Sequence, residues 1–247
     1  MIRESLSHKK SGLDKTFNWR GTEVSRLEGF SDAVFAFAMT LIVVSLEVPK
    51  TFDQLMEIMS GFGAFLICFV FLIMLWYEHF LYFRRYGLNT MFIIIINMLF
   101  LFLILYYVYP LKFLMTLIVK GLTGQTLFTI LPNGEKLYPV TQTQMPTVMV
   151  VYGLGYMAVY ALLGLMYWYA YRKRGELELS EIEILTTRSE VIGQLAMVGV
   201  GLLSVCVVLL TGSGGLAGVT YFLIGPLRGL LGWQYGRKLS RLRLTTQ

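Results

Sequence analysis

The chain has 247 residues, of which 56% are hydrophobic and only 15% are charged, and its formal net charge is +6. A soluble domain would struggle to stay in solution with this balance, so the composition indicates a polytopic membrane protein. The positive charge does not indicate nucleic-acid binding, because the basic residues stand beside apolar runs and not on a separate soluble face.

The polar residues 1–22 come first, and no small-residue cleavage pattern separates them from the first apolar run. We expect a short cytoplasmic segment and a retained first span, not a signal peptide. Both cysteines, Cys68 and Cys206, fall inside apolar runs, so we expect them to serve packing and not a disulfide framework or a metal cluster.

Six apolar runs follow, each close to the ~20 residues that cross the hydrocarbon core of a bilayer. They cover approximately residues 30–48, 60–83, 90–119, 147–171, 190–211 and 215–233. We therefore predict an all-α membrane protein in which residues 1–247 form a single subunit of six transmembrane helices. The third run contains Pro110, which predicts a kink or an exit from the membrane there.

Lys and Arg set the orientation, because cytoplasmic loops retain positive charge during insertion. With the amino terminus inside, the cytoplasmic side holds all of the 21 basic residues except Lys50, Lys112, Lys120 and Lys136. This asymmetry predicts that both termini are cytoplasmic.

The connections carry three further signals. The outer loop, residues 120–146, contains Leu131-Pro132-Asn133-Gly134, a turn signal whose flanks predict a small hairpin. The inner segment RKRGELELSEIE mixes basic and acidic residues and favours a solvated helical linker. The sequence GSGG at 212–215 predicts a tight antiparallel connection. Close helix contact in the fifth span is expected at its small residues Gly193, Ala196, Gly199 and Gly201.

The first span carries an apolar stripe with one hydroxyl. At the helical spacings of three and four, one face holds Phe30, Ala33, Phe37, Thr40 or Leu41, and Val44. Such a stripe usually faces lipid or another helix. Ser31 and Asp32 at its start weaken that interpretation, because polar groups facing lipid are costly, although Asp32 is also consistent with an interfacial helix cap.

Buried polar groups in a membrane need partners. By the predicted topology, one inner end brings together residues of the first three spans: Arg26, Ser31, Asp32, His79 and Asn97. For His79 alone, an interfacial residue bonded to a backbone carbonyl is an equally good interpretation. Because His8 is the only other histidine and no phosphate-binding glycine loop precedes a helix, we expect no enzyme, no bound metal, no cofactor and no nucleotide-driven pump.

These residues also form a recognisable pattern. Arg26-x-x-x-Phe30-Ser31-Asp32, followed by a helix ending in Val48-Pro49, resembles the signature of the transmembrane protein 175 family of potassium channels in its prokaryotic, single-repeat form. Trp76-x-x-His79 and the run from Asn97 to Pro110 are similar to the family's second and third spans. The resemblance covers roughly residues 20–115.

The resemblance implies a homotetramer whose first helices surround a central pore without a carbonyl filter. It maps the selectivity rings to Phe37, Leu41 and Val44, with Thr40 beside them. It implies that the motif residues hold the helices in register, namely Arg26, Phe30, Ser31 and Asp32, with His79 and Asn97 as further members. Phe37 departs from the Ile or Leu of relatives, and its ring would plug the pore more tightly or rotate as a gate.

Three functions follow from these observations. The first is a passive potassium-selective channel of the cell membrane, with potassium as the permeant ion passing near Thr40. The second is a proton-coupled ion transporter in which Asp32 and His79 titrate. The third is a structural membrane protein whose polar cluster only assembles helices. In each case the expected partners are further copies of the chain and the lipid bilayer.

Overall fold

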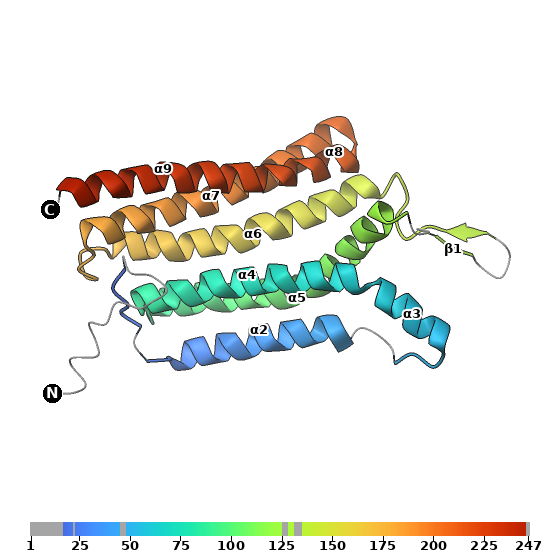
Figure 1. The fold of residues 1–247 in the computed structure, drawn as a ribbon, viewed down its shortest axis with the longest axis horizontal. Coiled ribbons are helices and arrows are strands. Elements are labelled where there is room, and N and C mark those ends of the chain that lie inside the picture. The colour runs from blue at the N-terminus through green and yellow to red at the C-terminus, as the bar shows by residue number, and fades with distance from the viewer. Residues whose placement is uncertain (1–16, 22, 45–47, 125–127, 131–134, 246–247) are drawn as a thin grey trace.

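The computed structural model describes residues 17–21, 23–44, 48–124, 128–130 and 135–245; at Val44, Glu57, residues 129–130 and residues 243–245 it describes the backbone alone. The described chain is an elongated bundle of long helices (Figure 1). The helices are α2 (Arg26–Val44), α3 (Phe52–Ser60), α4 (Phe62–Tyr86), α5 (Met91–Leu122), α6 (Met145–Arg172), α7 (Glu181–Thr211), α8 (Gly214–Val219), a 3-10 turn η1 (Thr220–Leu223) and α9 (Ile224–Thr245).

Five helical segments among the described residues are long and apolar enough to cross a membrane: Phe62–Tyr86, Met91–Leu122, Met145–Arg172, Glu181–Thr211 and Gly214–Leu242. They correspond to the second to sixth predicted spans. The helix α2, predicted as the first span, is not among them. It has 19 residues and carries Arg26, Glu28 and Asp32 in its first two turns.

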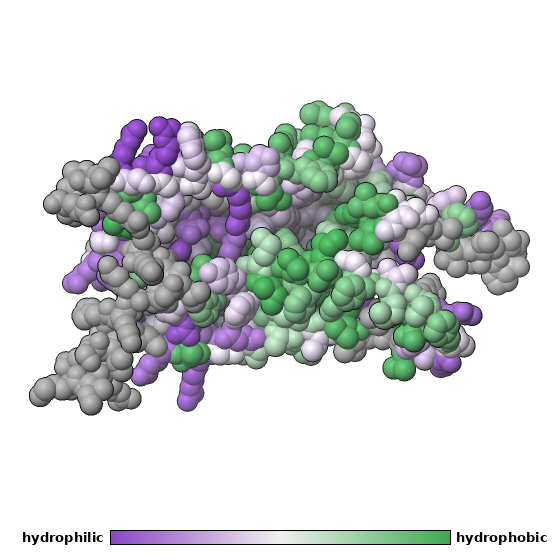
Figure 2. Space-filling model, in the orientation of Figure 1, coloured by the Kyte–Doolittle hydropathy of each residue, from purple (hydrophilic) through white to green (hydrophobic). Residues whose placement is uncertain are grey.

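The bundle has two edges. The helix α2 lies along one edge in Figure 1 and α9 along the other, with α4 to α7 between them. The space-filling view shows hydrophobic residues across the middle of the molecule and hydrophilic residues gathered toward its ends, most of them at the end where α9 finishes (Figure 2). This distribution is the one expected of a protein that crosses a bilayer lengthwise.

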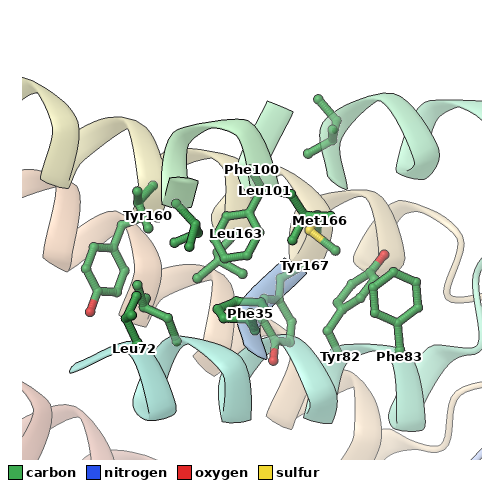
Figure 3. Packing of buried hydrophobic residues seen from close by; sticks show 14 of the residues in the cluster. Phe35, Leu72, Tyr82, Phe83, Phe100, Leu101, Tyr160, Leu163, Met166 and Tyr167 are labelled. Carbon is green, nitrogen blue, oxygen red and sulfur yellow. The ribbon is translucent and has the colours of Figure 1, made fainter. Parts of the chain in front are cut away.

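The core is apolar and rich in aromatic rings (Figure 3). Phe35 of α2 packs against Phe100 of α5, with ring centroids 6.0 Å apart, and Tyr82 of α4 meets Tyr167 of α6 edge-on at 5.3 Å. All four side chains are at most 1% exposed. Cys68 is buried and Cys206 is exposed, so the packing prediction is right for Cys68 and wrong for Cys206; both thiols are free.

Several boundaries differ from the predictions. The helix α7 starts at Glu181 and not near 190. Ser180 and Glu183 form a capping box, which starts the helix before the apolar run begins. The inner segment is not a helical linker, since residues 173–178 form turns. The last span is broken by η1, and the amphipathic helix α3 of nine residues was not predicted at all.

The helix α5 continues through Pro110 without a break, and Figure 1 shows it bending toward its end. The hydroxyl of Tyr152 donates to the Pro110 carbonyl, which ties this part of α5 to α6. The predicted hairpin is present as β1 (Thr129–Ile130) paired antiparallel with β2 (Lys136–Leu137), although its turn, residues 131–134, lies outside the described residues.

Close contact between α6 and α7 depends on glycine. A side chain at Gly201 would come within 2.5 Å of Met157, and one at Gly153 within 2.5 Å of Val205. The prediction of close packing is therefore right for Gly201. It is wrong for Gly193 and Gly199, where an added Cβ would have no atom within 4 Å.

Candidate functional site

The helix α2 has one buried face and one exposed face. Ser31, Phe35, Ala38 and Ile42 are 0–1% exposed and follow the helical spacing of four and three. On the opposite side, Phe30 is 53% and Phe37 56% exposed, and Ala33 and Thr40 are exposed as well. The predicted stripe is thus an open surface along the edge of the bundle.

The structure also separates the two residues that the periodicity left as alternatives. Thr40 lies on the exposed face, whereas Leu41 is half-buried and packs against the hydrophobic core. The Thr40 hydroxyl donates to the carbonyls of Phe37 at 2.7 Å and Ala36 at 3.1 Å. Because its hydrogen points to the backbone, the lone pairs of its oxygen are left for acceptor contacts on the exposed side. The side chain of Val44 lies outside the described residues.

A chain of hydrogen bonds runs behind the buried face of α2. His79 Nε2 lies 2.7 Å from Asn97 Oδ1, Asn97 Nδ2 donates to Ser31 Oγ at 2.9 Å, and Ser31 Oγ donates to the Leu27 carbonyl at 2.8 Å. Since the Ser31 hydrogen is used by Leu27, Asn97 must donate to Ser31, and its oxygen then accepts from His79. All donors in this series of hydrogen bonds therefore point the same way, from His79 of α4 through Asn97 of α5 to Ser31 of α2.

His79 is fixed by its apolar surroundings as well. Its ring stacks on Phe100 with a centroid distance of 5.7 Å and an interplanar angle of 5°. Phe35 and Phe83 also lie beside it, at 5.7 Å and 4.8 Å. The side chain is 1% exposed. This buried ring is therefore part of the packing of α2, and its hydrogen-bond partner is the Asn97 side chain and not a backbone carbonyl.

The other motif residues are not part of this series of hydrogen bonds. Asp32 is exposed and accepts a hydrogen bond of 2.8 Å from the indole of Trp76. Phe30 is exposed on the stripe. Arg26 is exposed too and makes no hydrogen bond or ion pair within the part of the chain that the structure describes. The structure thus brings together Ser31, His79 and Asn97, but not Arg26, Phe30 or Asp32.

Both ends of α2 are held by residues that the sequence analysis did not select. At the start, the Ser25 amide donates to Glu28 Oε2 at 3.0 Å and the Glu28 amide to Ser25 Oγ at 3.2 Å. Glu28 also lies 3.6 Å from Arg84. At the other end, Lys112 Nζ donates to the Ile42 carbonyl at 2.8 Å, a cation at the negative end of the helix. The spacing Ser25-x-x-Glu28 is typical of a capping box and could have predicted the start of α2. No local sequence pattern indicates the contact of Lys112 with the end of α2.

A short segment before α2, residues 17–21, which we call the N-terminal strap, ties this end of the bundle together. Arg20 makes two hydrogen bonds to the Glu183 carboxylate, at 3.1 Å and 3.0 Å, and one of 2.8 Å to the Leu177 carbonyl. The Asn18 amide also donates to Glu183, at 2.8 Å. Phe17 is fully buried. The predicted solvation of the acidic linker is therefore wrong at Glu183, which is 1% exposed.

A second ion pair lies deeper in the bundle. Arg228 of α9 approaches Glu78 of α4 to 2.6 Å, and Gln194 of α7 donates to the other Glu78 oxygen at 2.9 Å. Arg228 was predicted to lie on the cytoplasmic side; it stands nine residues before Arg237, at the end of α9, and the structure pairs it with Glu78 of α4. Its partner stands far away in sequence, so the basic-residue count alone could not reveal the pair.

Comparison with known proteins gives consistent matches. A family model described as "Endosomal/lysosomal potassium channel TMEM175" matches residues 26–107. A protein named "Potassium channel" from Marivirga tractuosa is 38% identical over 237 residues, which cover 94% of this chain and 95% of that protein. A potassium channel from Chamaesiphon minutus is 33% identical over 66 residues, covering 24% and 32%.

Two solved structures are also similar. The crystal structure of a threonine-to-alanine variant of the potassium channel MtTMEM175, bound to a nanobody fusion, superposes with a TM-score of 0.77 and 37% identity, covering 94% of this chain and all of that one. A TMEM175 homolog from Chamaesiphon minutus superposes with a TM-score of 0.51 and 21% identity over 85% of this chain and 96% of that one, which supports the fold alone.

Proposed function

Because the chain belongs to the TMEM175 family of ion channels, which are not enzymes, we propose that it forms a passive potassium-selective channel as a homotetramer. In this proposal α2 crosses the membrane together with the five longer segments, giving six spans per subunit. The exposed face of α2 lines a central pore. One α2 cannot enclose a hole, so the four copies supply one face each.

The observation that carries the pore proposal is the division of α2 into two faces. Its buried face is anchored by the chain through Ser31, Asn97 and His79, while Phe37 and Thr40 stand open at the edge of the bundle. A helix that only faced lipid would not need the polar side chains of Asp32 and Thr40 on or beside its exposed side.

Each proposed ring has a physical task. Four Phe37 rings would form an apolar constriction that hydrated ions cross only after losing water. Thr40 lies three residues further, about 4.5 Å along the axis. Its oxygens accept contacts from a cation and would replace part of the shed hydration shell. Leu41 would pack beside the pore wall and Val44 would continue the wall at the next turn.

The motif residues then have supporting roles. Ser31, with Asn97 and His79, would fix the rotation of α2 about its own axis, so that Phe37 and Thr40 face the pore. Asp32 would add a second tie through Trp76. Arg26 and Phe30 are both exposed in the single chain; in this proposal they would meet a neighbouring subunit and hold the four helices in register.

We also propose that the end of the bundle carrying the strap faces the cytoplasm of the cell, so that both termini are cytoplasmic. The basic residues at the ends of α4, α6 and α9 support this orientation: Arg84, Arg85, Arg172, Lys173, Arg174, Arg237, Lys238 and Arg241.

The decisive experiment is the reversal potential of the purified protein in liposomes under opposed potassium and sodium gradients. We expect a value near the potassium equilibrium potential, and a shift toward zero in Thr40→Val, which keeps the shape of the side chain and removes its hydroxyl. Thr40→Ser keeps the hydroxyl and should retain selectivity. The matched control for Phe37→Ala is Phe102→Ala, because Phe102 of α5 is 62% exposed but lies outside the proposed pore.

Flux that is indifferent to substitution at both Phe37 and Thr40 would overturn the pore assignment. Saturable exchange coupled to a proton gradient would favour the transporter. The structure gives Asp32 and His79 separate partners, Trp76 and Asn97, so no direct contact between the two supports a titrating pair.

A further inference from the structure

The last two helices that run toward the strap end, α6 and α9, carry the same local arrangement. In α6, Arg172 lies over the ring of Trp168 at 5.1 Å; in α9, Arg237 lies over the ring of Trp233 at 4.6 Å. Each arginine follows its tryptophan by one helical turn. Both tryptophans are exposed, Trp168 by 41% and Trp233 by 58%.

The rotation of α9 is set by its contacts with the bundle. Arg228 faces inward to Glu78, and the Tyr235 hydroxyl lies 2.7 Å from that of Thr186 on α7. Trp233 and Arg237 stand two residues before and after Tyr235, which places both about 200° around the helix from it. The Trp–Arg pair of α9 therefore points away from the bundle, and Lys238, the next residue in the sequence, is also exposed.

The two pairs differ in their electrostatic surroundings. The α6 pair is followed by the acidic residues of the inner segment, and its neighbour Lys173 is bridged to Glu176 at 2.5 Å. After Glu190, by contrast, the sequence contains no Asp or Glu, and its basic residues are Arg228, Arg237, Lys238, Arg241 and Arg243. Arg228 pairs with Glu78, whereas Arg237 and Lys238 make no ion pair within the residues that the structure describes. The positive charges of these two residues are therefore available to a ligand.

We propose that Trp233, Arg237 and Lys238 form a binding surface for an anionic phospholipid of the surrounding membrane. The indole lies against the glycerol and acyl region, where tryptophan is favoured at the bilayer interface. The guanidinium, already oriented by the ring, donates two parallel hydrogen bonds to the lipid phosphate. Lys238 adds a second cation, so a lipid with net negative charge is preferred over a zwitterionic one.

The α6 pair is the built-in comparison. It has the same aromatic ring and the same guanidinium, but the carboxylates that follow it compete with a phosphate for the cations. We infer that Trp168 contacts lipid with little preference for headgroup charge, whereas Trp233 selects anionic lipid. The inference concerns the membrane-facing surface and does not depend on ion conduction.

Tryptophan fluorescence in liposomes tests the proposal directly. The full-length protein is reconstituted into phosphatidylcholine containing brominated phosphatidylglycerol or brominated phosphatidylcholine, since bromine quenches a tryptophan that touches the lipid. The contribution of Trp233 is the difference between wild type and Trp233→Phe. Each basic residue near an anionic surface is worth about fivefold in association, so we expect Trp233 to prefer brominated phosphatidylglycerol by at least about fivefold.

The double variant Arg237→Gln with Lys238→Gln should lower this preference to about one, while Arg237→Lys should retain part of it. The matched control, Arg172→Gln with Lys173→Gln, removes two charges from the same end of the molecule and should leave the Trp233 preference unchanged. Raising the salt concentration should weaken the preference in wild type and in the matched control, but should change little in the Arg237→Gln, Lys238→Gln variant.

Equal quenching by the two lipids would overturn the proposal. Quenching by neither would overturn it as well, because it would mean that another copy of the chain covers this face of α9. The readout stays informative if the protein conducts no potassium, so failure of the lipid surface and failure of the channel proposal are distinguishable.

Discussion

The two edge helices, α2 and α9, are held in different ways. Both present one face outward, but α2 is tied along its whole length: to Asn97 and Trp76 through side chains, to Arg84 near its start and to Lys112 near its end. In α9, the polar contacts with the bundle include Arg228 with Glu78 and Tyr235 with Thr186.

The difference indicates how accurately each exposed face has to be positioned. A side chain that lines a narrow pore must be held within a fraction of an ångström, because contacts with an ion depend steeply on distance. A surface that meets fluid lipid tolerates small rotations. The polar contacts spread along α2 thus match the precision that its proposed function requires.

The largest expected effect comes from cutting the hydrogen-bond chain behind α2. Asn97→Leu leaves both Ser31 and His79 without their partner in the core, and we expect a loss of about 2–3 kcal/mol in the free energy of unfolding. Unfolding in mixed micelles of dodecylmaltoside and SDS measures it. The comparison on the other edge is Thr186→Val, which should cost about 1 kcal/mol; equal losses in the two variants would remove the distinction between the edges.

The next effect tests the deeper tie of α9. Arg228→Gln removes the ion-pair partner of Glu78, and because Arg228 is 39% exposed we expect only about 1–2 kcal/mol of destabilisation in the same micelles. Adding Glu78→Gln should recover part of the loss, since the unpaired carboxylate disappears. Full additivity of the two substitutions would show that the pair contributes no coupling energy.

A smaller effect is expected at the far end of α2. Lys112→Met removes the cation from the negative end of the helix dipole, which is worth about 0.5–1 kcal/mol. The same variant should broaden the distribution of single-channel currents, because the end of the proposed pore wall is less fixed. Planar-bilayer recording checks this, with Lys120→Met, in the last turn of α5, as the control that should leave the currents unchanged.

The smallest change in stability should accompany substitutions on the exposed faces. Phe37→Ala on α2 and Leu230→Ala on α9 remove side chains that are 56% and 52% exposed, and each should alter unfolding by no more than about 0.5 kcal/mol. Only Phe37→Ala should change potassium flux in liposomes. A flux change of equal size in Leu230→Ala would mean that α9 also takes part in conduction.

Much of this fold could be predicted from hydropathy, since five of the six predicted spans appear as long apolar helices in nearly the predicted order and length. The exposed stripe could be placed as well, because helical periodicity alone puts Phe30, Ala33, Phe37 and Thr40 on one face. The start of α7 was recoverable from a local signal, the capping box of Ser180 and Glu183.

The rest depended on pairing between distant segments. Glu78 with Arg228 and Arg20 with Glu183 join residues that no local pattern relates. Because their partners could not be identified from the sequence, Glu183 was predicted to be solvated and Arg228 to be cytoplasmic. The short helix α3 was missed because nine residues are too few to stand out in a search for spans.

The strap has a consequence for how the chain is made. Arg20 of the strap is synthesised before its partner Glu183, which lies 163 positions later in the sequence. At the usual pace of translation this gap lasts on the order of ten to thirty seconds. During that time α2 has already been made, but the strap that precedes it has no final docking place. The strap can therefore reach its final position only after the ribosome has synthesised the beginning of α7.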